Sequence, residues 1–250
     1  MRKTWLLLAC LFCLRANSQT VPFEKHILWD AFGATAVLDG TTSTGEGTCS
    51  AVIIDRHDQD YTLLSAAHCL GNVEYVQPPD VESDHFYLMS ENDQDLKVRL
   101  QLDFSDKFFV APDTIEDWKE PVKLLKIGNF DAGLDYSILS FHHESATPLP
   151  SAPLDPAPLA VGDTIFNVSL PLDRFKMTLF GTVARTDTDY RIWHHALALQ
   201  MPGVTHGSSG SAIFDGAGHV RAVVVGVDPD NPGIVMAIPA AEILLGNPSQ

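Results

Sequence analysis

The chain has 250 residues, of which 45% are hydrophobic and 19% are charged. That balance excludes a disordered polymer, which lacks the apolar surface needed to offset the entropy of ordering. A formal net charge of −16 makes the chain a poor binder of phosphate backbones, so we expect no nucleic-acid partner.

The N-terminus has the pattern of a secretory signal peptide over residues 1–18. Arg2 and Lys3 precede an apolar run at 5–14, and residues 16–18 are small, as signal peptidase requires. The run is shorter than the ~18 residues of a spanning helix, and no later run approaches that length. We therefore expect an exported protein, secreted or periplasmic, with no membrane span in the mature chain.

Two of the four cysteines, Cys49 and Cys69, remain after residues 1–18 are removed. Disulfides persist in exported proteins. Two thiols are too few for a structural zinc site, and their spacing is not that of a redox pair. A single disulfide is the favoured interpretation, and it would add roughly 3 kcal/mol by the chain-entropy estimate.

In the first half, short apolar runs separated by polar turns predict β-strands. Residues 49–54 and 61–66 have the pattern of two strands joined by a turn. Residues 79–121 are less regular and rich in acids, and carboxylates are the ligands that calcium prefers. Because no ordered ligand loop with a central glycine is present, we expect a solvated insertion there instead.

A proline-rich segment, residues 147–159, separates the chain into two halves. Proline at this density blocks both helix and central strand, so we expect an extended linker between domains at 19–146 and 160–250. Strands spaced by ~10 residues are typical of β-barrels or sandwiches. The strands predicted beyond the linker lie at 164–170, 176–184, 194–201, 211–214, 220–227 and 233–238, and only residues 240–245 have a helical pattern.

The segment LSAAHC, residues 64–69, places a histidine at the end of the predicted hairpin, beside a cysteine. It resembles the histidine motif of the chymotrypsin-like (trypsin-fold) serine peptidases at every position: an aliphatic residue, Ser or Thr, Ala, a small residue, His and Cys. That family also bridges the cysteine to a strand just upstream, where Cys49 lies. The resemblance implies that His68 is a general base.

The segment THGSSGS, residues 205–211, places glycines around a serine, so that backbone N–H groups can converge on an oxyanion. It resembles the same family's pattern, which implies Ser209 as nucleophile and the N–H groups of Gly207 and Ser209 as oxyanion hole. Ser208 departs from the usual Asp or Asn, and no Ile-Val-Gly-Gly activation site is present. Both departures agree with the bacterial HtrA-type and glutamyl-endopeptidase-like branches.

The segment LDYSIL, residues 134–139, resembles the family's aspartate segment. The resemblance implies that Asp135 accepts the ring N–H of His68. Asp131 is an alternative, but no apolar segment follows it directly. The order His68, Asp135, Ser209 differs from the α/β-hydrolase and subtilisin orders. The resemblance covers about residues 30–245 and implies an all-β fold of two tandem six-stranded antiparallel barrels with a short C-terminal helix.

The resemblance implies a serine endopeptidase that acts on polypeptide substrates and needs no cofactor. Gly203 lies six residues before Ser209, where members specific for Arg or Lys carry an acid. The stretch Val225-Gly226-Val227 predicts a small or apolar side chain before the scissile bond, and His206 offers an acidic preference as the alternative. The sequence carries no signal for oligomeric state.

Two features leave other functions to be considered. The Ser208 departure and the acidic insertion are compatible with a catalytically inactive relative that acts as a binding or chaperone-like module.

The adjacent histidines at 142–143 and 194–195 predict no metal site, because neighbouring residues of a strand point to opposite faces.

Overall fold

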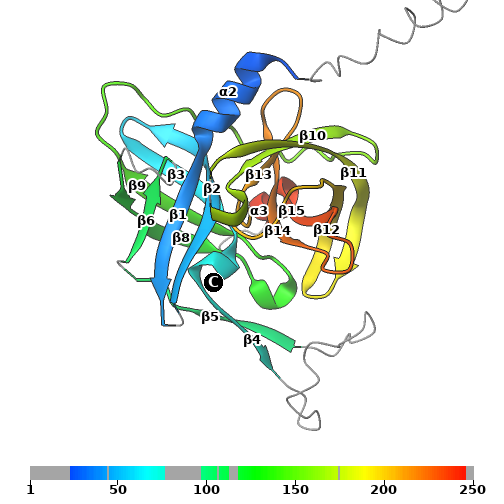
Figure 1. Ribbon diagram of the computed structural model, residues 1–250. Helices are drawn as coiled ribbons and strands as arrows, with labels where there is room; N and C mark the ends of the chain where they lie inside the picture. Colours follow the sequence, from blue (N-terminus) through cyan, green and yellow to red (C-terminus); the bar gives the residue numbers. More distant parts are fainter. Residues whose placement is uncertain are drawn as a thin grey trace, which may run out of the picture.

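The computed structural model describes residues 23–43, 45–76, 97–105, 107–112, 118–173 and 175–245. The predicted signal peptide and residues 79–96 of the acidic insertion lie outside the described residues. Two β-sheet lobes lie side by side, with a helix across their junction (Figure 1). Within the described ranges, no helix is long and apolar enough to cross a membrane.

The first lobe is a seven-stranded antiparallel sheet in the order β7-β6-β1-β2-β3-β9-β8. A separate ribbon of β4 and β5 extends from it (Figure 1). The bounds are β1 Thr35–Thr42, β2 Gly45–His57, β3 Asp60–Ser65, β4 Gly71–Val76, β5 Lys97–Leu102, β6 Phe108–Ala111, β7 Glu120–Pro121, β8 Lys123–Ile127 and β9 Ser137–His142.

The prediction for the first lobe is wrong in the number of strands and in the closure of the barrel. The sequence predicts six strands in a closed barrel, whereas the described residues form seven strands without a closing pair between β7 and β8. Alternation still sets the core: in β9, Ser137, Leu139 and Phe141 are buried while the residues between them are not. The lobe is a curled half-barrel around its own apolar cluster.

The second lobe is a closed six-stranded barrel in the order β10-β11-β12-β15-β14-β13. This confirms the predicted barrel and the trypsin-like, mostly β fold. The bounds are β10 Thr164–Ser169, β11 Met177–Tyr190, β12 Trp193–Gln200, β13 Ala212–Phe214, β14 Val220–Val227 and β15 Ile234–Pro239, followed by helix α3 Ala240–Leu245. β11 extends six residues beyond its predicted end, because its hairpin with β12 continues through three register shifts.

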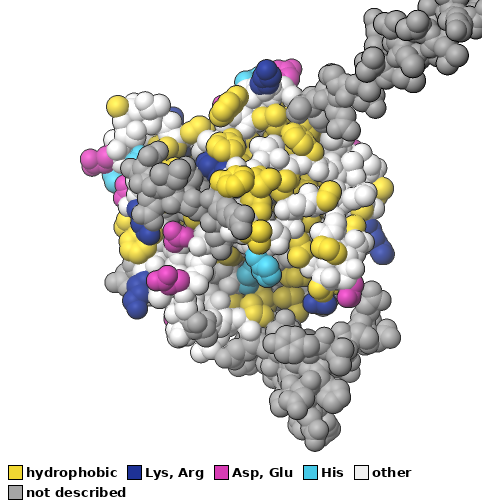
Figure 2. Space-filling view, in the orientation of Figure 1, with side chains coloured by type: hydrophobic (Ala, Val, Ile, Leu, Met, Phe, Trp, Pro, Cys, Tyr) yellow, Lys and Arg dark blue, Asp and Glu magenta, His cyan; other side chains and the backbone are white. Residues whose placement is uncertain are grey.

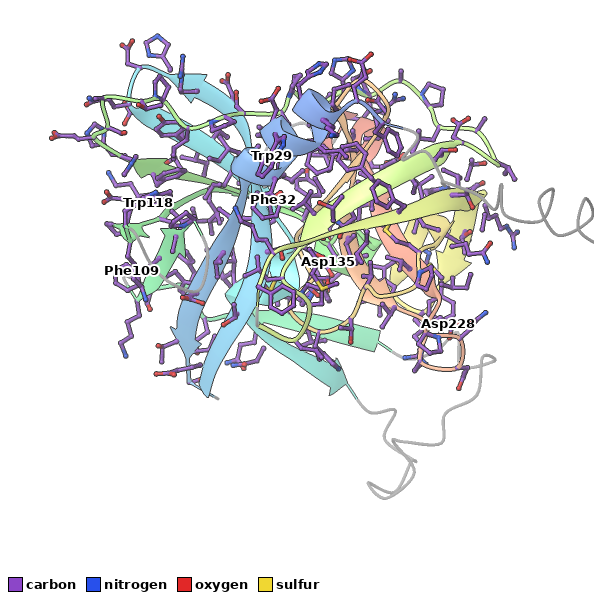
Figure 3. The ribbon with its side chains drawn as sticks, turned by 45° about the horizontal axis from the view of Figure 1, so that its top comes forward. Trp29, Phe32, Phe109, Trp118, Asp135 and Asp228 are labelled. Atoms are coloured by element: carbon purple, nitrogen blue, oxygen red, sulfur yellow. A yellow bond between two sulfur atoms is a disulfide. The ribbon has the colours of Figure 1, made fainter. Side chains whose placement is uncertain are left out.

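Helix α2, Lys25–Ala34, is not expected from the sequence. Its buried residues are small, Ala31 and Ala34, and no side chain caps its first turn, so the usual start signal is missing. Lys176 anchors its end by donating to the carbonyl of Phe32 at 2.9 Å. Figure 3 shows Trp29 and Phe32 on this helix, above the junction of the lobes.

One hydrophobic cluster crosses the junction and joins the two lobes. It contains Val52 and Leu64 from the first lobe, Phe166 and Val223 from the second, and Ala34 from α2. The proline-rich segment also contacts both lobes, since Ala152 N donates to Ile53 O and Val220 N to Pro153 O, each at 2.9 Å. The relative position of the lobes is therefore set by packing and by backbone hydrogen bonds.

Candidate active site

The predicted acid–base pair is assembled at the junction of the lobes. His68 lies in the short 3-10 helix η1, Ala67–Leu70, directly after β3. Its Nδ1 is 2.7 Å from Oδ2 of Asp135, and its backbone N–H donates to Oδ1 at 3.0 Å. Asp135 lies between the lobes in Figure 3. The two residues, 67 positions apart, are brought together by the pairing of β3 with β9.

The carboxylate of Asp135 is buried, with 1% of its surface exposed. A buried charge of this kind requires partners. Besides the two donors of His68, the indole Nε1 of Trp193 donates to Oδ2 at 3.2 Å. Trp193 begins β12 in the second lobe, so this donor reaches across the junction. Three N–H donors thus hold one carboxylate in place.

His68 has a raised pKa. Burial lowers it, but the charge of Asp135 and the hydrogen bond to that carboxylate more than offset burial, so the pKa lies above its ordinary 6.5. The side chain is 23% exposed. One ring nitrogen of His68 is therefore hydrogen-bonded to Asp135, while part of the side chain remains accessible to solvent.

A turn before β9 selects Asp135 over the alternative Asp131. Residues Phe130–Ala132 form the 3-10 helix η3, and Gly133 ends it with φ +78°, a left-handed conformation that favours glycine. A Cβ on Gly133 would lie 2.5 Å from the backbone nitrogen of His194, so the second lobe packs directly on this turn. Asp131 is exposed, and Asp135 points inward.

The disulfide predicted between Cys49 and Cys69 is present, with their Cα atoms 6.2 Å apart. It joins β2 to η1, next to His68. Ser50, which follows Cys49, contacts the loop that carries Ser209: Ser50 N donates to Ser209 O and Ser50 Oγ to Gly207 O, each at 2.8 Å. The disulfide and Ser50 therefore link the His68 segment to the serine loop.

Gly210 brings the serine loop close to the strand that leads to His68. Its φ is +82°, and a Cβ there would lie 2.2 Å from Ser65 Oγ and 2.9 Å from Ala66 N. Only glycine permits this approach without strain or overlap. Ser209 is partly exposed, and its hydroxyl makes no hydrogen bond to His68 or to any other described residue. Hydrogen bonds of this kind often tighten only when substrate binds.

The predicted oxyanion donors are oriented by hydrogen bonds to neighbouring carbonyls. Leu172 N donates to His206 O at 2.7 Å, and Ser211 N to Ser208 O at 3.1 Å. In a trans peptide the N–H points opposite to the C=O, so the N–H groups of Gly207 and Ser209 face away from these bonds. Neither donates to another described residue, which leaves both available to a ligand.

Ser208, the departure from the family pattern, has a structural role in this loop. It is fully buried, and its Oγ accepts a hydrogen bond from Thr205 N at 3.4 Å. Its carbonyl accepts a second one from Ser211 Oγ at 2.6 Å. Ser208 closes the turn before Ser209 without a charge.

The predicted specificity residues divide into two groups. Gly203 and His206 are exposed on the loop before Ser209. Val225 is buried in the cluster at the junction, and Val227 packs on the core of the second barrel, so neither side chain lines an open pocket by itself. Gly226, between them, contacts the indole of Trp193. Figure 2 draws one face of the molecule and shows histidine atoms at its middle, with hydrophobic side chains above and below them.

Two groups of metal-ligating residues occur in the described ranges. Cys49 and Cys69 lie near His68, but the disulfide occupies both sulfurs. Asp155, Asp215 and His219 lie together on the second lobe, where Arg221 donates to Asp215 at 2.8 Å, so the carboxylate of Asp215 already has a cationic partner.

The paired histidines lie apart from those groups and each has a carboxylate partner. His142 is exposed beside Asp60 and His143 is buried beside Glu120, as alternation along a strand requires. His195 has φ +53°, so alternation is broken at 194–195, where the two rings pair with Asp189 and Asp187. The two rings of each pair therefore do not face a common metal position.

Comparison with known proteins agrees with the fold. The chain belongs to the trypsin-like peptidase domain family, whose model matches residues 49–226. A search of the curated proteins finds no match. Among solved structures, the serine endoprotease from Yersinia pestis is similar at TM-score 0.59 and 18% identity, over 88% of this chain and 63% of its own.

Two other structures share the fold. The HtrA-type protease AlgW, solved with a tripeptide, has TM-score 0.58 and 17% identity, over 88% of this chain and 61% of its own. The thermostable serine protease AL20 from an extremophilic microorganism has TM-score 0.61 and 16% identity, over 87% of this chain and 96% of its own. The chain thus spans less than two thirds of the Yersinia protein and of AlgW. At these identities the likeness concerns the fold.

Sequence reasoning did not find Ser50, Leu172 or Trp193, which act on this site through hydrogen bonds. The motifs contain none of them. The contacts of Ser50 and Trp193 exist only because the two lobes meet at the junction, whereas the contact of Leu172 joins two loops of the second lobe.

Proposed function

We propose that the protein is a secreted serine endopeptidase that hydrolyses peptide bonds through an acyl-enzyme on Ser209. One observation carries the proposal: in a member of the trypsin-like family, His68 Nδ1 lies 2.7 Å from the buried carboxylate of Asp135. That pair is the acid–base half of a catalytic triad. The contacts of Gly207, Ser209 and Gly210 with the first lobe support the placement of the nucleophile beside it.

In the proposed reaction the Ser209 hydroxyl attacks the substrate carbonyl while His68 takes its proton through Nε2. Asp135 keeps the other ring nitrogen protonated and stabilises the imidazolium. The N–H groups of Gly207 and Ser209 bind the oxyanion, each contributing roughly 3 kcal/mol to transition-state stabilisation. His68 then returns the proton to the leaving amine, and water hydrolyses the ester by the same steps in reverse.

For specificity we propose a small or apolar side chain before the scissile bond. Gly203 carries no charge, and the Val225–Val227 stretch contributes backbone and no charged side chain. The exposed ring of His206 supports an acidic preference as the alternative. Cleavage-site profiling with a peptide library distinguishes the two: cleavage after Asp or Glu would refute the apolar preference.

A fluorophosphonate probe tests the enzyme proposal, because it reacts only with an activated serine. We expect labelling of the mature wild-type protein and of Ser151→Ala, an exposed serine in the proline-rich segment, but none of Ser209→Ala. A folded wild-type protein that is not labelled would instead support the inactive binding module. The absence of a Ser209–His68 hydrogen bond is the observation that favours that second candidate.

Export is part of the same proposal and has its own measurement. If residues 1–18 are a signal peptide, the protein recovered outside the cytoplasm begins near residue 19 and carries the Cys49–Cys69 disulfide. Intact-mass analysis before and after reduction reports both. A product that retains Met1, Arg2 and Lys3 would contradict the export proposal and leave the peptidase proposal standing.

A further inference from the structure

The β11–β12 hairpin of the second lobe reaches the acid–base pair, and no motif of the sequence accounts for this contact. The indole Nε1 of Trp193 donates at 3.2 Å to Oδ2 of Asp135, the same oxygen that lies 2.7 Å from His68 Nδ1. One carboxylate oxygen therefore receives a donor from each lobe. The side-chain partners of the buried carboxylate are His68 and Trp193 alone among the described residues.

The indole is held in this orientation from two sides. A Cβ on Gly226 would lie 2.4 Å from Cη2 of Trp193, so the six-membered ring rests directly on the β14 backbone. On another side the ring of Tyr190 stacks on it, with centroids 6.3 Å apart and planes inclined by 11°. The Tyr190 hydroxyl donates to Asp228 at 3.0 Å, which anchors the tyrosine in turn. Figure 3 shows Asp228 at the outer end of the second lobe and Asp135 at the junction.

We propose that Trp193 is a positioning residue, whose indole N–H holds Asp135 in the orientation that His68 needs. The catalytic meaning of this inference rests on the proposed function. The coupling between the three side chains can be measured without turnover. The same indole packs on Gly226, so it connects the strand expected to line the substrate site with the acid–base pair.

The direction of the effect follows from charge. An N–H donor on Oδ2 draws negative charge away from His68, so removing it strengthens the attraction between Asp135 and the imidazolium. Trp193→Phe keeps a large aromatic ring on Gly226 and deletes only this donor. We expect the pKa of His68 to rise by ~0.5 unit, and kcat to fall about tenfold because the carboxylate is less well oriented.

Other charged groups near the pair do not supply this shift. Tyr190 stays protonated from pH 5 to 9, because burial and its hydrogen bond to Asp228 raise its pKa above 10.0. The guanidinium of Arg191 lies over the ring of Tyr190, 5.4 Å from its centroid. His194 also lies at this junction, where it packs on Gly133, and its ring lies 3.4 Å from Asp189.

The experiment is a pH titration of the histidine resonances of the mature protein by NMR. It compares wild type, Trp193→Phe and a matched control, Trp118→Phe, which alters a tryptophan stacked on Phe141 in the first lobe. We expect a higher His68 midpoint and a shifted Nδ1–H signal in Trp193→Phe, and neither change in Trp118→Phe. Gly226→Ala, which displaces the indole while keeping its N–H, should shift the His68 midpoint in the same direction.

An unchanged His68 midpoint and Nδ1–H signal in folded Trp193→Phe would overturn the proposal. Equal shifts in Trp193→Phe and Trp118→Phe would overturn it as well, because the effect would then be general. If the titration behaves as expected but the fluorophosphonate fails to label wild type, the peptidase proposal fails and the positioning of Asp135 by Trp193 stands.

Discussion

The acid–base pair and the serine loop are held by different kinds of contact. His68 and Asp135 both belong to the first lobe, where the β3–β9 ladder brings them together. The carboxylate is then fixed by three N–H donors. The serine loop belongs to the second lobe and meets the first through Ser50 and Gly210. Its position therefore depends on how the two lobes pack.

Because of this difference, substitutions in the two regions should have different effects. A change at Asp135 should alter proton transfer while the fold remains, since the pair is built inside one sheet. A change at Gly210 or Ser50 should weaken the junction and displace the nucleophile while the pair stays intact. Labelling rate, stability and pH dependence report these effects separately.

The largest effect is expected from Asp135→Asn, which tests the pair alone. The amide keeps the shape but turns a donor or an uncharged oxygen toward His68, which loses its preferred tautomer and its counter-charge. We expect kcat to fall ~10⁴-fold with little change in folding, as for this change in other triads. Circular dichroism and peptidase assays check it, and a loss below tenfold would argue against the role of Asp135.

Next in size is Gly210→Ala, which tests the junction. The added Cβ meets Ser65 Oγ and Ser50 O, each 2.2 Å away, in a left-handed conformation. Such a site costs of order 1–3 kcal/mol for backbone strain alone, and overlap adds to it. We expect a loss of about 3 kcal/mol or more in denaturant unfolding and a strongly reduced labelling rate. Gly162→Ala is the matched control, because its φ is +92° with open space around the Cβ.

Ser50→Ala is a milder test of the same contact. It removes the hydroxyl that donates to Gly207 O at 2.8 Å and accepts from Leu170 N at 3.1 Å. The buried Leu170 N–H and the half-buried Gly207 carbonyl each lose a hydrogen bond, at a cost of roughly 1–3 kcal/mol. We expect slower fluorophosphonate labelling with an unchanged His68 titration. A shifted titration would mean that the Ser50 contact, and not only the Trp193 contact, affects the pair.

The pH dependence is the smallest effect and reports the pair directly. The pKa of His68 is raised above 6.5 when folded, so protonated His68 stabilises the fold fully below the unfolded pKa. This contribution is lost as pH rises through the folded pKa. Activity has the opposite sign because the base must be neutral, and kcat/KM should rise with a midpoint above 6.5. A midpoint below 6.5 would contradict the raised pKa.

Much of the fold and of the acid–base pair follows from local patterns in the sequence. The strands of the second barrel are predicted mostly within a residue of their observed bounds, because period-2 burial and turn residues act locally. The sequence favours Asp135 over Asp131 because an apolar segment follows it, and in the structure Asp135 is buried while Asp131 is exposed. Helix α2 is missed because it has small buried residues and no capping side chain, so only packing on both lobes stabilises it.

By itself the sequence determined which side chains are proposed to carry the chemistry: the histidine beside a disulfide, the aspartate before a strand and the serine between glycines, in an order typical of one family. The tertiary structure alone decided what surrounds them, including the unclosed first sheet, the contact of Ser50 with the serine loop and the indole of Trp193 on Asp135. The reason is physical. A motif is a short stretch of backbone whose conformation its own residues specify, whereas a contact between lobes depends on the closure of two sheets and the packing between them.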